Sequence, residues 1–207
     1  MDIEKTINEI EQILGMNVSH KRESYSLVNN YQEAEQVIKS CILHINNISA
    51  DDYVENKNYS KCFDYMINTN GLGLALFGDY GTGKTDFIKV ILNYLFYVKY
   101  KKIIFFIDTK RINDEIYEKI IMKQSALICL DDVGSENDYK ITNKYIPAII
   151  DHIYSTKCIL YLTSNKSRTQ FEQLYGKPVV DRILGICQVI EFEGESFRTK
   201  NKKKKLV

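Results

Sequence analysis

The chain has 207 residues, of which 44% are hydrophobic and 27% charged, and 28 basic residues nearly balance 27 acidic ones. This composition excludes a globally disordered chain, a collagen-like repeat and a uniformly polybasic nucleic-acid binder. No apolar run approaches the ~20 residues that a membrane-spanning helix needs, and no two of the five cysteines form a C-x-x-C pair. We therefore expect a cytoplasmic protein with reduced thiols and no membrane partner.

The first 71 residues show helical periodicity. An apolar stripe on one helical face consists of Ile3, Ile7, Ile10 and Leu14. A second stripe runs from Ala34 to Ile45, after polar residues 16–30 that are typical of a linker. We expect a loop over 46–59 and a short helix over 60–67. The first stripe suits either docking onto a partner or packing on the core of its own chain.

From residue 72 onward, short apolar runs alternate with helical stretches. The runs lie at Leu72–Phe77, Ile103–Ile107, Leu127–Leu130, Cys158–Leu162 and Val189–Phe192. The intervening patterns predict helices over roughly 85–98, 110–123, 143–154 and 168–175. Because apolar runs without strict alternation are typical of strands covered on both faces, the sequence predicts an α/β fold with a parallel sheet.

The first predicted strand is followed by a phosphate-binding pattern. Residues 78–85 read GDYGTGKT and match G-x-x-x-x-G-K-[ST] between a strand and a helix. Glycines let backbone N–H groups approach phosphate oxygens, and the following helix adds its positive end. We expect Lys84 to reach the β- and γ-phosphates of ATP and Thr85 to hold Mg²⁺. The remaining residues expected to contact nucleotide are Gly78, Gly81, Thr82 and Gly83.

Two carboxylates follow the third predicted strand. Asp131 and Asp132 come directly after the apolar run LICL. Since buried charge is costly, they are expected at the carboxyl edge of the sheet, where ligands bind in open α/β folds. Asp131 would hold Mg²⁺ and Asp132 would polarise the attacking water. Asn165 ends the next strand and is a candidate for contacting the γ-phosphate or that water, unless it belongs to a helix-capping cluster.

Two of the five arginines lie in the closing segments VVDRILG and GESFR. Because a guanidinium neutralises phosphate charge bidentately, Arg182 and Arg198 are candidates for nucleotide contact. A surface salt bridge with Asp181 or Glu172 is the alternative for Arg182. The basic run Lys202–Lys205 either touches phosphate backbones or stays solvated.

Four segments give the chain a resemblance to the AAA+ ATPases of the DnaC/DnaI type, which are replicative helicase loaders, and to the similar IstB transposition helpers. They are GDYGTGKT, LICLDDVGSE, LYLTSNKS and LYGKPVVDRILGICQVIEFEGESFR, within about residues 60–198. The resemblance implies a P-loop AAA+ core with a five-stranded parallel sheet of order 5-1-4-3-2, flanked by helices, without a sizeable lid domain. The expected parts are an N-terminal helix and linker (1–30), an ATPase domain (31–198) and a basic tail (199–207).

The resemblance also implies a role for each candidate residue by position. Lys84 and Thr85 bind nucleotide and Mg²⁺, Asp131 is the acidic metal residue and Asp132 holds the position of the catalytic acid. Asn165 is the sensor on the fourth strand. Arg182 is the finger offered to a neighbouring subunit, and Arg198 is the second sensor. The acidic pair is Asp-Asp where the family often has Asp-Glu, and the shorter side chain predicts slow hydrolysis.

The expected function is therefore ATP binding and hydrolysis, used to load or remodel a replicative DNA helicase on DNA. The helicase would dock on the stripe of Ile3, Ile7, Ile10 and Leu14, single-stranded DNA is a second candidate partner, and copies of the chain would associate through Arg182. Such hydrolysis would be stimulated by assembly or DNA. The alternatives are an IstB-like transposition helper, a nucleotide-gated adaptor with negligible turnover, and a P-loop small-molecule kinase, for which a lid and an arginine cluster are not evident.

Overall fold

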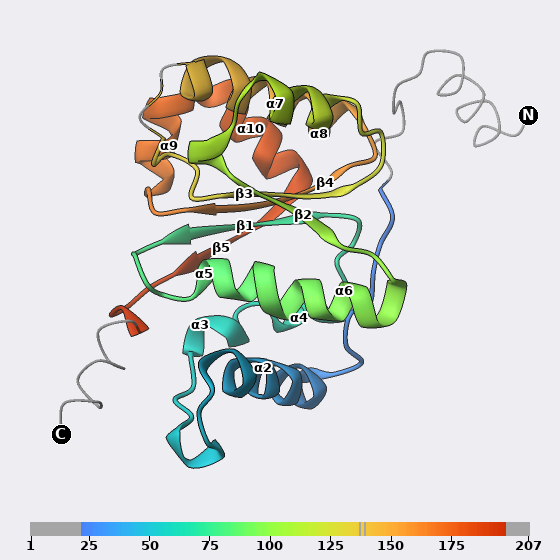
Figure 1. Cartoon of the computed structure of the whole chain (residues 1–207), viewed down its shortest axis with the longest axis vertical. Coiled ribbons are helices and arrows are strands. Elements are labelled where there is room, and N and C mark those ends of the chain that lie inside the picture. Colours follow the sequence, from blue (N-terminus) through green and yellow to red (C-terminus); the bar gives the residue numbers. More distant parts are fainter. Residues whose placement is uncertain (1–21, 137, 139, 198–207) are drawn as a thin grey trace, which may run out of the picture.

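The computed structural model describes residues 22–136, 138 and 140–197, and their strands form one parallel sheet (Figure 1). The strands are β1 (Gly73–Gly78), β2 (Ile104–Asp108), β3 (Leu127–Asp131), β4 (Ile159–Ser164) and β5 (Cys187–Phe192). Their order across the sheet is β2-β3-β4-β1-β5. Read from the other edge this is 5-1-4-3-2, so the expected fold is confirmed.

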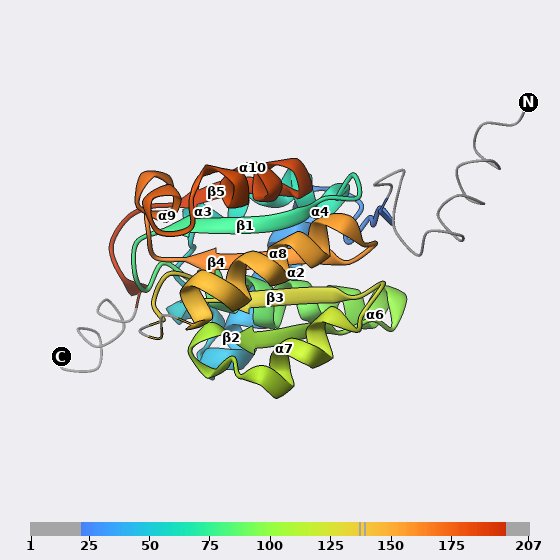
Figure 2. The same cartoon turned by 90° about the horizontal axis from the view of Figure 1, so that it is seen from above.

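Helices cover both faces of the sheet (Figures 1 and 2). One face carries α7 (Asp114–Ile121), α8 (Ile146–Ser155), α9 (Arg168–Tyr175) and α10 (Lys177–Ile186). The other carries α3 (Lys57–Ser60), α4 (Phe63–Ile67), α5 (Lys84–Asp86) and α6 (Asn93–Tyr100). The π-helical stretch Phe87–Leu92 joins α5 to α6, and a second such stretch, Ile141–Tyr145, precedes α8. Helix α2 (Tyr31–Asn46) forms an outer layer beneath α4 and α6 (Figure 1).

Successive side chains of each central strand point to opposite faces of the sheet and pack in two different hydrophobic cores. Leu74 and Leu76 of β1 pack on the side of α2 and α6, whereas Ala75 and Phe77 pack on the side of α8 and α10. All four side chains are buried. Because both faces are apolar, the strand sequence shows no polar alternation, which is the pattern that predicted the parallel sheet.

Three of the predicted local features differ from the structure. Helix α10 was not among the predicted helices; its Pro178 occupies the first turn, where the missing N–H costs nothing. The predicted loop over 46–59 contains a short 3₁₀ turn at Ala50–Asp52 and helix α3. The helix predicted over 110–123 is shorter in the structure: a 3₁₀ turn at Thr109–Arg111 comes first, and α7 follows at Asp114–Ile121.

The expectation of a polar linker over 16–30 is wrong for its described part. Tyr25, Leu27 and Val28 are buried in the core, and the N–H of Leu27 donates to the carbonyl of Met66 at 2.8 Å. These apolar residues are isolated among polar ones. They show neither the period of a strand nor that of a helix, so the sequence pattern does not predict their burial. The stripe Ile3–Leu14 and the basic run Lys202–Lys205 lie outside the described residues.

Arg22 fastens this segment to the far side of the sheet. Its guanidinium donates to the carbonyls of Ile153 and Tyr154, in the last turn of α8, at 2.8 and 3.0 Å, and to the carbonyl of Cys158 at 2.8 Å. The last turn of a helix has more carbonyls than N–H donors, and Arg22 supplies donors to two of them; the carbonyl of Ile153 also accepts from the N–H of Thr156 at 3.4 Å. Among the helices of the described ranges, none combines the length and apolar character that crossing a bilayer demands.

We predict that Arg22→Ala lowers the free energy of unfolding by about 2–3 kcal/mol, because it removes charge-assisted bonds to three carbonyls. Urea denaturation followed by circular dichroism measures this change. Arg111→Ala is the matched control: Arg111 is 82% exposed and forms one surface ion pair with Asp108, which is worth ~1 kcal/mol or less. Equal losses in the two variants would contradict an anchoring role for Arg22.

Candidate functional site

The loop that joins β1 to α5 requires glycine at its tight positions. Gly78 has a φ of 121°, and a Cβ there would lie 1.9 Å from the carbonyl oxygen of Phe192 on β5. Gly83 has a φ of 95°, and its Cβ would meet the Tyr59 hydroxyl at 2.5 Å. Because no side chain fits at either point, the backbone itself forms the inner surface of the loop, as a phosphate cradle needs.

Lys84 directs its ammonium into this loop. Its side chain is almost fully buried, and Nζ donates to the carbonyls of Gly78 and Asp79 at 2.8 and 2.6 Å. The Thr82 hydroxyl also donates to the Asp79 carbonyl, at 2.8 Å. A buried ammonium ringed by loop carbonyls is a fixed positive charge at the mouth of the cradle. It can exchange these carbonyls for phosphate oxygens with little movement.

Asp131 lies at the junction of three elements. Its Oδ1 accepts a hydrogen bond from the hydroxyl of Thr85 at 2.8 Å and another from the hydroxyl of Thr163 at 2.7 Å. A hydroxyl beside a carboxylate offers the hard oxygen ligands that Mg²⁺ prefers. The described residues contain no cluster of three or more His, Cys, Asp or Glu side chains placed to hold a metal. Because Mg²⁺ is commonly bound by one or two protein oxygens together with phosphate oxygens and water, the pair of Thr85 and Asp131 suits it.

Asp132 is held in a backbone conformation that is uncommon for a residue other than glycine. Its φ is 62°, and its N–H donates to the Thr163 hydroxyl at 2.8 Å. One carboxylate oxygen accepts hydrogen bonds from Asn165 and, at 2.8 Å, from Ser135. Such conformations persist where surrounding contacts hold them in place, often at functional sites.

The other carboxylate oxygen of Asp132 forms an ion pair with Lys110 at 2.7 Å. The hydrogen bond to Asp132 raises the pKa of Lys110. Lys110 and Thr163 were missed by the sequence analysis, although each follows or ends an apolar strand. The polar end of a strand was the available signal, but neither residue belongs to the motifs from which the site was predicted.

A cavity of 460 Å³ brings these groups together. The predicted residues Gly81, Thr82, Gly83, Lys84, Thr85, Asp131, Asp132 and Asn165 line it, together with Lys110 and Thr163. It opens at the carboxyl edge of the sheet, on the left in Figure 1. Gly78 shapes the loop behind it without lining it.

A second wall of the cavity comes from a part of the chain that contains none of the predicted site residues. Its residues are Ile42, Asn46, Ile48, Tyr53 and Val54. Below them Asn56 donates from its amide to the Thr82 carbonyl at 2.8 Å, and the hydroxyl of Tyr59 donates to the Gly83 carbonyl at 3.3 Å. A partly apolar wall beside a phosphate cradle can accommodate the base and sugar of a nucleotide. No motif marks these residues, since only the folding of α2 onto the core places them here.

Asn165 belongs to the cavity, whereas Arg182 does not. Asn165 donates to Asp132, and the helix-capping role belongs to Ser167, which is the N-cap of α9 and accepts from the N–H of Gln170. Arg182 lies on α10, away from the cavity, and forms an ion pair at 2.9 Å with Asp151 of α8. The partner is thus neither of the two acids considered from the sequence. Arg198 lies outside the described residues.

Comparison with known proteins places this geometry in a family. The chain is 25% identical over 155 residues to the replicative helicase loader DnaI of Bacillus subtilis (strain 168), covering 65% of this chain and 50% of that protein. It thus spans about half the length of this curated relative. Its fold is similar to the crystal structure of the DnaC helicase loader, with 18% identity, coverage of 79% and 92% of the two chains, and a TM-score of 0.51. The family model described as IstB-like ATP binding protein matches residues 62–205. That match spans well over half of the sequence, so the chain belongs to the IstB-like ATP-binding family.

Proposed function

We propose that the chain binds ATP with Mg²⁺, hydrolyses it slowly, and uses this cycle to help load or remodel a replicative DNA helicase on DNA. The observation that carries the ATPase part is the meeting of Lys84, Thr85, Asp131 and Asp132 in one cavity. The similarity to the DnaI loader supports the helicase part. A loader acts where DNA is replicated, which agrees with the cytoplasmic location expected from the sequence.

Each side chain has a task in hydrolysis. Lys84 would neutralise the β- and γ-phosphates, and Thr85 and Asp131 would hold Mg²⁺, which supplies further charge neutralisation when bound. Asp132 would orient and polarise the attacking water. Its carboxylate is already aimed by Ser135, Asn165 and Lys110. Because an aspartate side chain held by three neighbours reaches less far toward the attacking water than a glutamate, we expect slow turnover.

Fast hydrolysis would depend on assembly, since no arginine of the described chain lines the cavity. We assign to Arg182 the finger that one copy offers to the nucleotide of the next. About a third of its side chain is exposed, and its partner Asp151 is half exposed, so this ion pair can open at little cost. Single-stranded DNA is a further candidate partner of the assembled protein.

Two other functions use the same cavity. An IstB-like transposition helper would share the ATPase core and recruit a transposase instead, and the family match favours it as the second candidate. A small-molecule kinase is disfavoured, because its acceptor phosphates or hydroxyls call for cationic side chains opposite the γ-phosphate. In the described part of the cavity only Lys84 and Lys110 are basic.

Lys84→Ala is expected to weaken ATP binding ~30-fold or more, because it leaves the phosphates without their buried counter-charge. Fluorescence anisotropy of a labelled ATP analogue measures the dissociation constant. Lys89→Ala, an exposed lysine on the same long helix, serves as the control and should bind normally. Retained affinity in Lys84→Ala would remove the loop from nucleotide binding.

Turnover per chain should rise with protein concentration in the unaltered protein and stay flat and low in Arg182→Ala. A trans arginine contributes ~10³–10⁵-fold to hydrolysis, so the loss should be of that order at saturating concentration. Asp151→Asn breaks the same ion pair but keeps the guanidinium, and it should preserve the concentration dependence. If both variants behave alike, Arg182 has only a structural role.

The helicase proposal is tested by co-purifying the full chain with a replicative DNA helicase. Ile7→Asp places a charge in the apolar stripe and should abolish capture, whereas Asn8→Asp adds the same charge outside the stripe and should not. Loading onto single-stranded DNA circles then gives the functional readout. Capture of a transposase and not of the helicase would transfer the proposal to the second candidate.

A further inference from the structure

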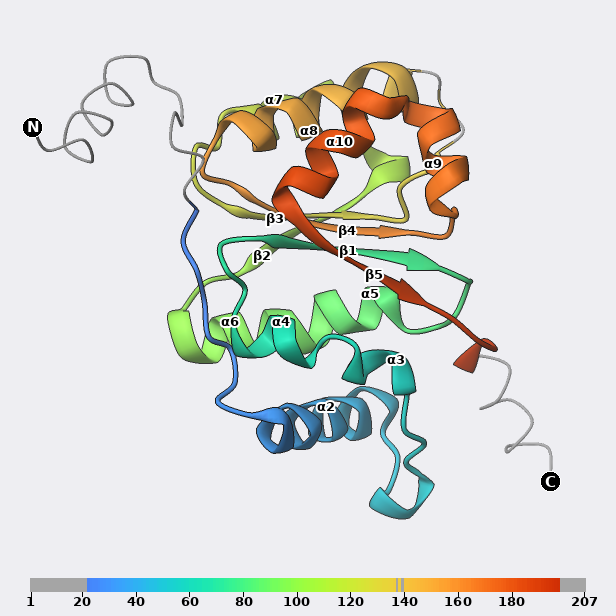
Figure 3. The ribbon, with the colours of Figure 1, turned by 180° about the vertical axis from the view of Figure 1, so that it is seen from behind.

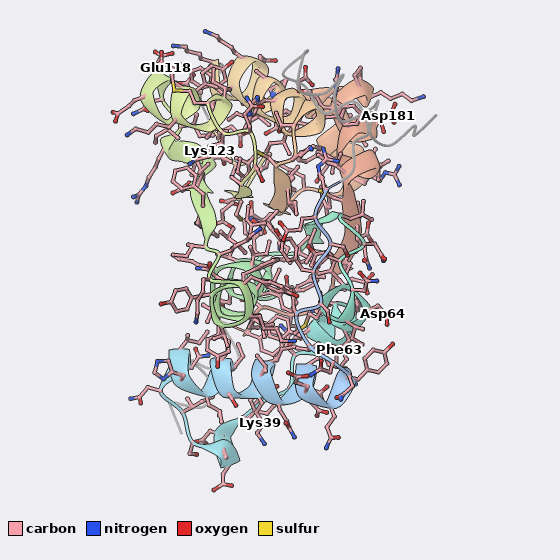
Figure 4. All side chains as sticks on the ribbon, turned by 90° about the vertical axis from the view of Figure 1, so that its right-hand side faces the viewer. Lys39, Phe63, Asp64, Glu118, Lys123 and Asp181 are labelled. Carbon is pink, nitrogen blue, oxygen red and sulfur yellow. The ribbon has the colours of Figure 1, made fainter. Side chains whose placement is uncertain are left out.

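A second groove lies at the opposite edge of the sheet from the nucleotide cavity, where the strands begin. It has a volume of 530 Å³ and is lined by the starts of β2, β3 and β4 and by residues of the segment 23–25. Figure 4 faces this edge, with Lys123 beside the lower end of α7. Large apolar side chains are exposed here: Ile103 leaves 65% of its surface accessible and Phe105 leaves 40%.

Lysines surround this apolar surface. Lys102, Lys123 and Lys157 line the groove, and Glu23 is the one acid among its described lining residues. Glu23 is already paired with Lys102 at 2.5 Å. The ammonium of Lys123 lies over the ring of Phe105, 5.1 Å from its centroid. An apolar floor with a basic rim is complementary to an amphipathic segment whose polar side is acidic.

The chain itself contains such a segment. Residues 2–14 carry the apolar stripe of Ile3, Ile7, Ile10 and Leu14. The same residues include four acids outside the stripe, Asp2, Glu4, Glu9 and Glu11, against one base, Lys5. A helix of this length is marginal alone in water, so it gains most of its stability from a surface that covers its apolar face.

The attachment point of this segment is at the groove. Arg22 donates to the carbonyl of Cys158, whose chain neighbours Lys157 and Ile159 both line the groove, as does Glu23. The seven residues 15–21 can span up to ~25 Å when extended, and a 13-residue helix is ~20 Å long. The segment can therefore reach any part of the groove, at the millimolar effective concentration of a short tether.

We propose that residues 2–14 of this chain dock in this groove as an amphipathic helix. The stripe covers Ile103 and Phe105, and the acids face Lys123 and Lys157. A partner that binds the same stripe then competes with the groove for it. The groove lies at the opposite edge of the sheet from the nucleotide cavity, and the two have no described lining residue in common.

Hydrogen–deuterium exchange of the full-length protein, followed by mass spectrometry at two protein concentrations, tests the proposal. Residues 2–14 should exchange slowly at both concentrations. Ile7→Asp should speed their exchange ~10-fold or more, because undocked helices of this length open freely. Asn8→Asp, with the same charge outside the stripe, should leave it unchanged. Fast exchange of residues 2–14 in the unaltered protein would overturn the proposal.

Variants of the groove give the reciprocal test. Ile103→Asp should release residues 2–14, while Leu174→Asp, an apolar residue 39% exposed on α9, should not; thermal melting confirms that both fold. The double reversal Lys123→Glu with Lys157→Glu should also release the segment, and adding Glu9→Lys with Glu11→Lys should restore protection.

Protection that appears only at the higher concentration would assign the groove to a second copy. Protection of the groove only after adding oligothymidylate or helicase would assign it to that ligand, and either result overturns docking within the chain.

Discussion

The close approach of β1 to β5 at Gly78 determines where the phosphate loop of the nucleotide cavity lies. Gly78 pairs with Phe192 in the parallel register, and the space beside it is filled by the Phe192 carbonyl. The chain can leave the sheet here only without a side chain, and it turns back on itself at once. This turn brings the ammonium of Lys84 to the carbonyl of Gly78, six residues earlier. It also starts α5 so that Thr85 faces the neighbouring strands.

The order of the strands then supplies the acidic half of the cavity. Strand β4 lies between β1 and β3, and Thr163 near its end binds both the carboxylate of Asp131 and the N–H of Asp132. One threonine thus fixes the positions of two acids whose carboxylates point in different directions. Asp131 turns toward Thr85, whereas Asp132 turns toward Lys110 and Asn165. The roles proposed for Asp131 as a metal ligand and for Asp132 as a water-orienting acid need this separation, because one carboxylate cannot serve both positions.

The two edges of the sheet are organised differently. The carboxyl edge gathers loops whose polar groups bind one another around a cavity, as expected where parallel strands end. The amino edge is crossed by the segment 22–30, which Arg22 ties to α8 and Tyr25 ties to the core (Figure 3). The segment 22–30 thus connects the outer helix α2 to the sheet. Because residues of α2 also line the nucleotide cavity, this segment links the amino edge of the sheet to the wall that a bound base would contact.

The sequence alone determined the class of fold and the core of the site. Apolar runs separated by helical periods specify a parallel sheet, and the spacing GDYGTGKT specifies a phosphate loop, because both depend on residue type within a short stretch. The acids at the end of β3 followed from the cost of burying charge.

Only the tertiary structure identified Lys110 and Thr163, the wall from Ile42 to Val54 and the ion pair of Arg182 with Asp151. These depend on which distant segments meet, and no local pattern encodes that meeting. For the same reason the segment 22–30 resembled a linker: its three buried apolar residues, Tyr25, Leu27 and Val28, belong to a core that includes residues of α4 and α6, which lie far along the chain.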